Sequence, residues 1–302
     1  MPPAFRDSPQ FVSEPLSAWL GRPVVVKVET VNPVGCFKGR GTWLSVRHLV
    51  AAGVVGESRG LVVASAGNFG QGVAYAARAM NVPVSVVAAR SANPAKVEAM
   101  RRLGADVQLV GEDFDAARAA AAENADRQGW QLLVDGQDPW ITIGAGTMAV
   151  ELTDAVSRSD LPALQALYVP VGNGALIGGV GTWLKAASPA TRVIGVQAER
   201  APAMTLSWQQ QRTVATETAD TVADGIAVRV PVAEALTVMR GSVDDMVLVS
   251  EEAIIAAQNE LSAALPLAIE ASGAAAWAAM RTAPASAGAV AFVLTGGNVP
   301  PG

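Results

Sequence analysis

The chain has 302 residues, of which 51% are hydrophobic and 16% are charged. This composition excludes disorder as the main state, because disordered chains are poor in apolar residues and rich in charge. The net charge of −5 argues against a nucleic-acid binder, which needs a basic face for the phosphates. One cysteine and one histidine exclude an intrachain disulfide framework and metal sites built from those residues.

The amino-terminal sequence has no apolar segment typical of a signal peptide. No apolar run approaches the roughly 18 residues that a membrane helix needs. Together with the single cysteine, which suits a reducing compartment, these features predict a cytoplasmic protein that does not bind membranes. Residues 1–12 are expected to form a loose arm.

Short runs of valine, isoleucine and leucine alternate with longer alanine-rich segments along the chain. The runs predict strands at 24–28, 61–64, 84–88, 106–110, 131–134, 166–169, 192–197 and 290–294. The segments between them predict helices at about 70–80, 94–103, 113–127, 145–157, 176–187, 251–264 and 271–281. Nearly continuous apolar strands are typical of sheets covered on both faces, so the alternation predicts an α/β fold with parallel sheets.

Local signals mark the ends of some of these elements. Ser250, followed by two glutamates, indicates the start of a helix with favourable charges in its first turn. Gly104, after two arginines and a leucine, indicates the end of another helix. The threonine-rich stretch 210–222 has no periodicity and is expected to lack regular structure.

Three glycine-rich loops each follow a predicted strand and lead into a helix. They are Asn32–Gly41, Ser65–Gly72 and Pro170–Gly179. Ligands of open α/β sheets bind beyond the carboxyl ends of the strands, where backbone amides at a helix start favour anions. Taken alone, the third loop could bind a dinucleotide, as in a nicotinamide-dependent dehydrogenase. However, Ile177 stands where a third glycine is expected, and the first loop is left unexplained.

Together, the loops resemble those of the fold-type-II pyridoxal-phosphate enzymes, most of all the serine/threonine dehydratase and serine racemase group. That family carries Asn-Pro-x-Gly-Ser-Phe-Lys-x-Arg-Gly, then Ser-x-Gly-Asn-x-x-Gln, then a glycine-rich phosphate loop, then Ser/Thr-Gly-Gly-Asn. The last motif is Thr295–Asn298 here, and further matches lie at 144–151, 223–228 and 270–276. The resemblance runs in order from about residue 14 to residue 299.

The resemblance implies two open, mostly parallel twisted sheets flanked by helices, as in the β chain of tryptophan synthase. A large discontinuous domain, 1–58 and 143–302, would bind pyridoxal 5'-phosphate. A small domain, 59–142, would carry the second loop and move on substrate binding. The family implies a homodimer. The regulatory domain that biosynthetic threonine dehydratases carry after the Ser/Thr-Gly-Gly-Asn motif is not expected here.

The resemblance makes Lys38 the Schiff-base lysine, which would also remove the Cα proton of the substrate. Most lysines are solvated surface charges, but this one lies in a loop rich in glycine, directly after Phe37. Phe37 suits core packing as well as contact with the cofactor ring. Cys36 replaces the serine usual in the family, and a nucleophilic role is not expected for it.

Other cofactor contacts are implied by the same resemblance. Asn68 would bond the phenolic oxygen, and Thr295 would face the pyridine nitrogen from the end of a strand. The phosphate would be held by the backbone of Gly172, Asn173, Gly174, Ala175 and Leu176. Gly225 would let the backbone pass close to the cofactor. Glu270 would either contact the cofactor or provide a favourable charge at a helix start.

The second loop is expected to bind the substrate carboxylate. Its implied substrate contacts are Ser65, Ala66, Gly67, Phe69 and Gln71. Ser65 could equally cap the following helix. Racemases carry a serine base at the position of Ala66, so racemisation is expected to be poor. Phe69, Trp140 and Ala145 depart from the family's usual residues and are expected to make the substrate site more apolar.

A racemase-like cation site needs a pair of acids, and residues 197–203 lack it, so no metal is expected. A threonine hydroxyl cannot keep the pyridine nitrogen protonated, which favours β-elimination over transamination. The expected reaction therefore converts a 3-hydroxy amino acid, such as threonine or serine, to a 2-oxo acid and ammonia. The alternatives are β-replacement through an aminoacrylate, as in cysteine synthase, and a non-catalytic binding protein on the same fold.

Overall fold

The computed structural model describes residues 1–284 and 287–299, and the described chain forms two compact units. The smaller unit contains Met1–Phe5 and Lys38–Gly144, and the larger unit contains Arg6–Phe37 and Ala145–Val299. The boundary expected from the sequence assigned residues 38–58 to the larger domain, whereas the structure groups them with the smaller unit. The chain therefore passes from the larger to the smaller unit between Phe37 and Lys38.

Helices and strands alternate along most of the described chain, as expected. The strands are β1 (Gln10–Val12), β2 (Val24–Val28), β3 (Leu61–Ala64), β4 (Val84–Ala88), β5 (Asp106–Leu109), β6 (Gln131–Leu132), β7 (Leu164–Pro170), β8 (Arg192–Ala198), β9 (Asp245–Val249) and β10 (Ala289–Leu294). The helices are α1 (Glu14–Leu20), α2 (Lys38–Ala51), α3 (Asn68–Ala79), α4 (Pro94–Arg102), α5 (Phe114–Gln128), α6 (Pro139–Ser157), α7 (Ala175–Ala187), α8 (Ala203–Gln210), α9 (Ala233–Ser242), α10 (Glu251–Ala264) and α11 (Ala271–Thr282). Short 3-10 turns lie at Pro3–Phe5 and Asp224–Ile226.

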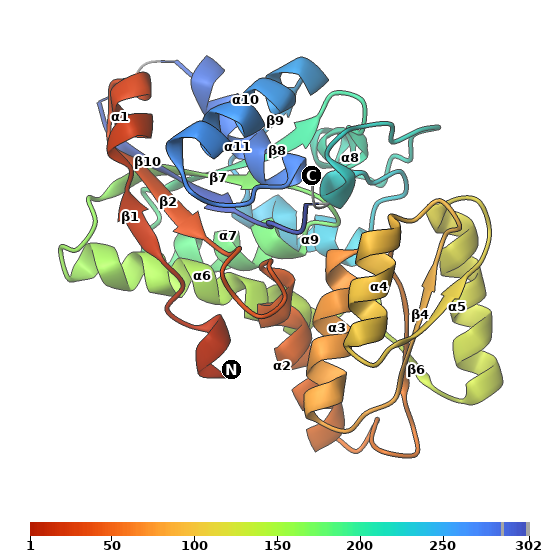
Figure 1. Cartoon of the computed structure of the whole chain (residues 1–302). Coiled ribbons are helices and arrows are strands. Elements are labelled where there is room, and N and C mark those ends of the chain that lie inside the picture. Colours follow the sequence, from red (N-terminus) through yellow and green to blue (C-terminus); the bar gives the residue numbers. More distant parts are fainter. Residues whose placement is uncertain (285–286, 300–302) are drawn as a thin grey trace. The chain divides into compact units, whose positions relative to one another are not determined.

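The larger unit is built on a six-stranded sheet with the order β1-β2-β10-β7-β8-β9. All neighbours are parallel except β1 and β2, which are antiparallel. Residues of β2 alternate between two cores: Val24 and Val26 pack with α10 and α11, and Val25 packs with α6 and α7 (Figure 1). Burial of both faces explains why the strands are almost continuously apolar.

The smaller unit is built on a parallel four-stranded sheet with the order β5-β4-β3-β6. Helix α5 covers one face, where Ala117 and Ala121 pack on Val62 and Val87 (Figure 1). Helix α3 packs against both α2 and α4. The expected α/β class with mostly parallel sheets is therefore confirmed in each unit.

Helix α11 lies in the core of the larger unit, and its residues from Ser272 to Met280 are buried. Alanine and glycine make up most of this segment, so the helix can approach the sheet closely. Trp277 is fully buried in the middle of α11 and packs on Phe292 of β10, with ring centroids 6.1 Å apart. No helix in the described part of the chain is long and apolar enough to cross a membrane.

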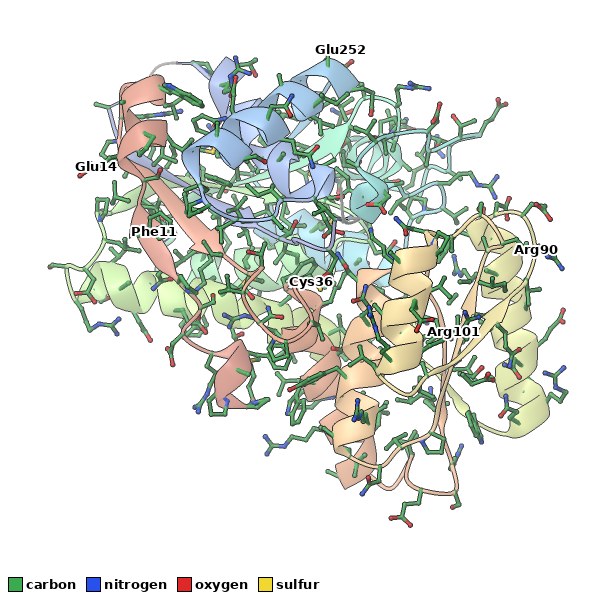
Figure 2. All side chains as sticks on the ribbon, in the orientation of Figure 1. Phe11, Glu14, Cys36, Arg90, Arg101 and Glu252 are labelled. Carbon is green, nitrogen blue, oxygen red and sulfur yellow. The ribbon has the colours of Figure 1, made fainter. Side chains whose placement is uncertain are left out.

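The expectation of a loose arm over residues 1–12 is wrong. Phe5 is 1% exposed and packs edge-on against Tyr75, with ring centroids 5.4 Å apart. Gln10–Val12 forms the edge strand β1, where Phe11 is exposed beside the start of α1 (Figure 2). A strand of three residues is too short to produce a periodic pattern, so the sequence carried no signal for it.

The helix-end signals are confirmed. Ser250 precedes α10 with an extended backbone, and its side chain accepts a hydrogen bond from the Ala253 N–H at 3.2 Å. The pKa of Glu252 is lowered, first by its own backbone N–H and then by the Ser250 hydroxyl. Gly104 lies just beyond α4 with φ at +92°. The segment 211–222 contains no helix or strand.

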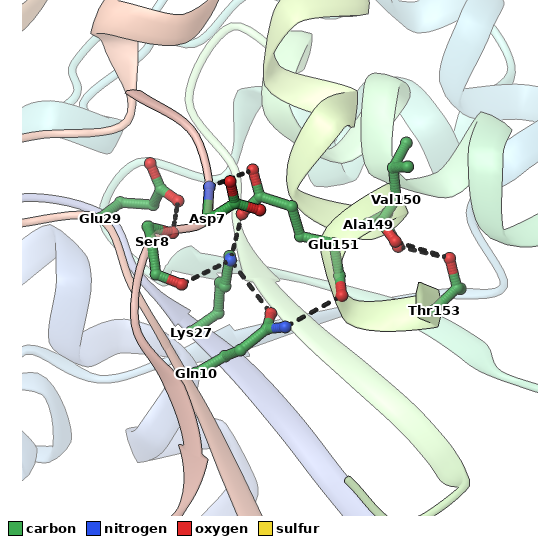
Figure 3. A network of polar contacts seen from close by, with 9 residues as sticks. All are labelled: Asp7, Ser8, Gln10, Lys27, Glu29, Ala149, Val150, Glu151 and Thr153. Carbon is green, nitrogen blue, oxygen red and sulfur yellow. Dashed lines mark hydrogen bonds and ion pairs between the residues drawn. The ribbon is translucent and has the colours of Figure 1, made fainter. Parts of the chain in front are cut away.

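A buried charge fastens the amino-terminal segment to the larger unit (Figure 3). Lys27 of β2 is 0% exposed, and its Nζ lies 2.5 Å from the Glu151 Oε2 of α6. The same Nζ donates to the Ser8 carbonyl and to the Gln10 Oε1, both at 3.0 Å. The Asp7 N–H donates to the Glu151 Oε1 at 3.0 Å. The Lys27 ammonium thus connects β2 to α6 and to the amino-terminal segment through a hydrogen-bonded network.

Candidate active site

Lys38 is the first residue of α2 in the smaller unit. Its Nζ donates to the Asp135 Oδ2 at 2.6 Å, and the two side chains are only 14% and 11% exposed. The Nζ also lies 6.0 Å from the ring centroid of Phe69, which is 7% exposed. The lysine predicted to be reactive is therefore not a solvated surface charge: a carboxylate and an aromatic ring flank its amine.

Close packing between α2 and α3 fixes the backbone around Lys38. A Cβ at Gly72 of α3 would lie 2.7 Å from the Thr42 Oγ1 and 3.4 Å from the Lys38 carbonyl carbon. Only glycine at position 72 leaves room for this approach. The Thr42 hydroxyl donates to the Lys38 carbonyl at 2.9 Å, which further fixes the first turn of α2.

The Ser65 loop leads from β3 into α3. The Ser65 Oγ accepts hydrogen bonds from the Gly70 N–H at 2.8 Å and the Gly67 N–H at 3.2 Å, so this hydroxyl shapes the loop. Asn68 begins α3, and the N-cap residue is Gly67, which has no side chain that could cap the helix. Gln71 is 5% exposed, and among the described residues its Nε2 has no hydrogen-bond partner. The loop therefore places a buried amide of Gln71, unpaired within the described chain, in the first turn of α3.

Lys96 is a basic group beside this loop that the sequence did not reveal. It lies on α4 and is 8% exposed. A Cβ at Gly67 would meet the Lys96 Cδ at 3.1 Å and its Nζ at 3.7 Å, so the lysine side chain runs directly over the Gly67 backbone. An ammonium and a helix start both favour an anion at this loop.

The third glycine-rich loop, Pro170–Gly179, is called the phosphate loop after its predicted role and leads from β7 into α7. Gly174 precedes α7 with φ at +90°, a conformation that favours glycine. A Cβ at Gly174 would lie 2.9 Å from the Met239 Sδ and 3.1 Å from the Ala235 Cβ, both on α9. In the described chain, no side chain caps this helix start, so its backbone N–H groups remain available to an anion.

Other predicted cofactor contacts adjoin the phosphate loop within the larger unit. A Cβ at Gly172 would lie 3.0 Å from the Gly225 carbonyl oxygen. The Gly225 N–H donates to the Ser272 Oγ at 2.9 Å. One residue further on, a Cβ at Gly273 would lie 3.5 Å from the Thr295 Oγ1. The structure thus brings three predicted segments together around the start of α11.

Backbone hydrogen bonds place Phe37 in the same neighbourhood. The Phe37 N–H donates to the Thr295 carbonyl at 3.0 Å, and Cys36 forms an antiparallel bridge with Gly296. The Glu270 N–H donates to the Gly296 carbonyl at 2.9 Å, and this bond holds the start of α11 against the segment that follows β10. Glu270 is 6% exposed at the N-cap position of α11.

A family model described as "Pyridoxal-phosphate dependent enzyme" matches residues 2–296, nearly the whole chain. The chain belongs to the pyridoxal-phosphate-dependent enzymes. This finding confirms the family expected from the ordered loops, and with it the cofactor. The lysine loop, the Ser65 loop and the phosphate loop all lie inside the matched region.

Several similar proteins carry the names threonine ammonia-lyase or threonine deaminase. A protein named L-threonine ammonia-lyase from Thermotoga maritima is 36% identical over 288 residues, which are 95% of this chain and 70% of that protein. Another of the same name from Geobacter sulfurreducens is 35% identical over 289 residues, with the same coverage of 95% and 70%. The structure of threonine deaminase isoform 2 from Solanum lycopersicum matches with a TM-score of 0.90 and 31% identity, covering 99% of this chain and 82% of that one.

The residues of the larger unit fit pyridoxal phosphate. The cofactor carries a phosphate monoester, and the start of α7 offers backbone donors. Gly172 and Gly174 precede these donors, and a Cβ at either glycine would lie 3.0 Å or less from a neighbouring atom. The Thr295 hydroxyl follows the buried strand β10, and Thr295 is 6% exposed. Within the described residues, no cluster of three or more His, Cys, Asp or Glu side chains could hold a metal ion.

Only one of the three apolar departures from the family pattern lies beside the lysine. Phe69 flanks the Lys38 amine, as described above. Trp140 instead stacks on the exposed His48, with ring centroids 4.4 Å apart. Ala145 is 1% exposed in the core formed by α6 and α7. The apolar character expected near the substrate therefore depends on Phe69.

Asp135 is the main residue at this site that sequence reasoning missed. A signal was present, because Asp135 directly follows the strand predicted at 131–134, and side chains at such strand ends often bind ligands. Neither the spacing of this acid nor its neighbours in the sequence indicate a partner for it. The partner, Lys38, lies 97 residues earlier in the chain, so only the folded unit brings the two side chains together.

Substitution of Gly174 by alanine should weaken the binding of pyridoxal phosphate. Alanine at φ of +90° is strained, and its Cβ would clash with Met239, so the backbone donors must shift. Strain of this kind costs about 1–3 kcal/mol, which predicts a rise in Kd of roughly tenfold. Titrating the cofactor into the protein and following its absorbance measures this change.

Gly241 provides a matched control on the neighbouring helix α9. A Cβ there would meet nothing within 4 Å, and the residue has no positive φ. Gly241→Ala should therefore bind the cofactor as the unmodified protein does. Equal affinities for the Gly174→Ala and Gly241→Ala variants would refute the assignment of the phosphate loop.

Proposed function

We propose that this chain is a lyase that removes water and then ammonia from a 3-hydroxy amino acid, such as threonine or serine, to give a 2-oxo acid. The observation that carries this proposal is the similarity to proteins named L-threonine ammonia-lyase over 95% of the chain. The Lys38 amine supports it, because its side chain is only 14% exposed and it lies beside Phe69 of the Ser65 loop. Turnover of threonine and serine, measured as release of 2-oxo acid, tests it.

We propose that the phosphate loop, Phe37 and Thr295 of the larger unit hold the cofactor. The contact of Asn68 with the cofactor is proposed from the family resemblance alone. When bound, pyridoxal phosphate supplies a sink for the electrons of the Cα–H bond. The Lys38 Nζ would accept the Cα proton, because Asp135 and Phe69 hold this amine in a defined position. The Ser65 loop would bind the substrate carboxylate, with the Gly67 backbone and the adjacent Lys96 supplying a donor and a positive charge.

Elimination is favoured over racemisation by the composition of the Ser65 loop. Racemisation requires a second base that returns a proton to the opposite face of Cα. Ala66 has no titratable group, and Ser65 already accepts two backbone hydrogen bonds within the loop. An elimination needs no second base, because the product forms without returning the proton to Cα.

The enzyme should prefer substrates with a neutral side chain over 3-hydroxyaspartate. Phe69 provides an apolar wall beside the Lys38 amine, and burying a second carboxylate without a partner costs several kcal/mol in order of magnitude. We expect kcat/KM for threonine or serine to exceed that for 3-hydroxyaspartate by roughly tenfold or more. Comparing the two with a β-aryl serine also shows whether a bulky apolar side chain is accepted.

Two outcomes would change this conclusion. If 3-hydroxyaspartate is the best substrate, Phe69 does not disfavour a charged side chain, and Lys96 is the basic group to test first. If no hydroxy amino acid reacts but O-acetylserine reacts with an added nucleophile, the enzyme catalyses β-replacement instead.

A further inference from the structure

The carboxylate at Asp135 is held in place by its own loop. Gly136 has φ at +87°, and the N–H groups of Gln137 and Asp138 both donate to the Val134 carbonyl, at 3.2 Å and 3.3 Å. The loop is thus a tight turn at the end of the strand, and it fixes the direction of the Asp135 side chain. That side chain reaches the Lys38 Nζ at 2.6 Å.

Asp138, the second acid of the loop, has a purely structural role. The Asp138 Oδ1 accepts from the Trp140 N–H at 2.7 Å, and its Oδ2 accepts from the Ser45 hydroxyl at 2.9 Å. Asp138 therefore fastens the loop to α2 and to the start of α6. Because Asp138 already performs this task, the contact of Asp135 with a reactive amine is not needed to anchor the loop.

We propose that Asp135 is a positioning residue for Lys38. The Asp135 carboxylate holds the amine at one point and stabilises its cationic form. A lysine side chain has about 2 kcal/mol of rotamer entropy to lose, so a fixed partner keeps the amine where it must act. This inference rests on the proposed function only in taking Lys38 as the reactive amine.

The role has a defined place in the elimination. As the Cα–H bond breaks, the Lys38 Nζ gains the proton, and the electron pair of that bond forms the Cα–Cβ double bond. The Cβ–O bond breaks with its electrons on oxygen, and the hydroxide leaves as water with the proton from Nζ. Asp135 neither gains nor loses a proton; it stabilises the ammonium during the interval between the two transfers.

The direct test is the reactivity of Lys38 in Asp135→Asn. The full chain, before cofactor is added, is treated with a small acylating reagent at one fixed pH, and modified lysines are quantified by peptide mass spectrometry. The label on Lys38 is divided by that on Lys185, a partly exposed lysine of the larger unit. We expect this ratio to rise about tenfold, because a hydrogen bond to a charged group is lost.

Lys27 reports general loosening in the same experiment, because it is 0% exposed and reacts only when the structure opens. An increase confined to Lys38 supports the proposal. An unchanged ratio in Asp135→Asn, an equal rise in Asp138→Asn, or a rise shared by Lys27 overturns it. Asp135→Glu keeps the charge and should lie closer to the unmodified protein than Asp135→Asn.

Steady-state kinetics provide a second readout. In Asp135→Asn, kcat should fall at least tenfold while KM stays within about twofold, since the substrate is held by other residues. A rise in KM alone would contradict a positioning role. The labelling experiment needs neither substrate nor cofactor. A failure to turn over hydroxy amino acids would therefore refute the proposed function without deciding the role of Asp135.

Discussion

Replacing Lys38 by alanine should abolish turnover while leaving the secondary structure intact. Loss of a general base alone typically lowers rates by about 10²–10⁴-fold, and Lys38 is also the expected point of covalent attachment. The assay is release of 2-oxo acid from threonine and serine. Circular dichroism checks that the protein is folded.

The attachment itself can be located independently of turnover. Reduction of the cofactor-loaded protein with borohydride, followed by peptide mapping, should place a pyridoxyl label on Lys38. Lys185→Ala serves as the control, because Lys185 lies in the last turn of α7 and pairs with Asp244. A label on any other lysine, or normal turnover by Lys38→Ala, would refute the assignment.

The largest effect on stability is expected for Lys27→Met. Methionine has a similar length but no charge, so the Glu151 carboxylate, whose side chain is 12% exposed, would lose its cation. Removing one partner of a buried ion pair typically costs about 3–5 kcal/mol. The Ser8 carbonyl and the Gln10 side chain would each lose a donor as well. Urea denaturation, followed by circular dichroism, measures the change.

Two further variants test whether the loss of stability is specific to the buried Lys27–Glu151 pair or common to ion pairs in general. Lys185→Met breaks a more exposed pair with Asp244, whose side chain is 31% exposed, and should cost about 1 kcal/mol or less. In Lys27→Met with Glu151→Gln, the orphaned charge is removed, so part of the lost stability should return. If Lys27→Met costs no more than Lys185→Met, the buried network does not stabilise the larger unit.

Buried, apolar elements were the best predicted parts of the fold. The strands expected at 24–28, 61–64 and 84–88 coincide with β2, β3 and β4. Their residues are covered on both faces, so the apolar run itself marks both ends. By contrast, β9 lies at the edge of its sheet, only two of its five residues are buried, and it was not predicted from the sequence. The short helix α1 was also missed, because its seven residues span only two turns.

The candidate site was predictable where it depends on motifs and not where it depends on packing. The glycines of the phosphate loop could be placed because backbone approach and positive φ demand that residue type. Asp135 carried only the weak signal of its position after a predicted strand, and Lys96 carried none, because ordinary surface acids and lysines look the same in a sequence. Their significance comes from neighbours in the folded unit, the Lys38 amine for one and the Gly67 backbone for the other.

Cys36 makes the opening of the lysine loop measurable. It is the one cysteine of the chain, it is 0% exposed, and it lies two residues before Lys38 (Figure 2). Its backbone forms an antiparallel bridge with Gly296. A thiol reagent can reach the sulfur only when this strand-like contact separates. The rate of labelling under native conditions therefore reports the free energy of local opening, without any introduced probe. The same measurement with and without cofactor would show how strongly binding rigidifies the segment that leads into Lys38.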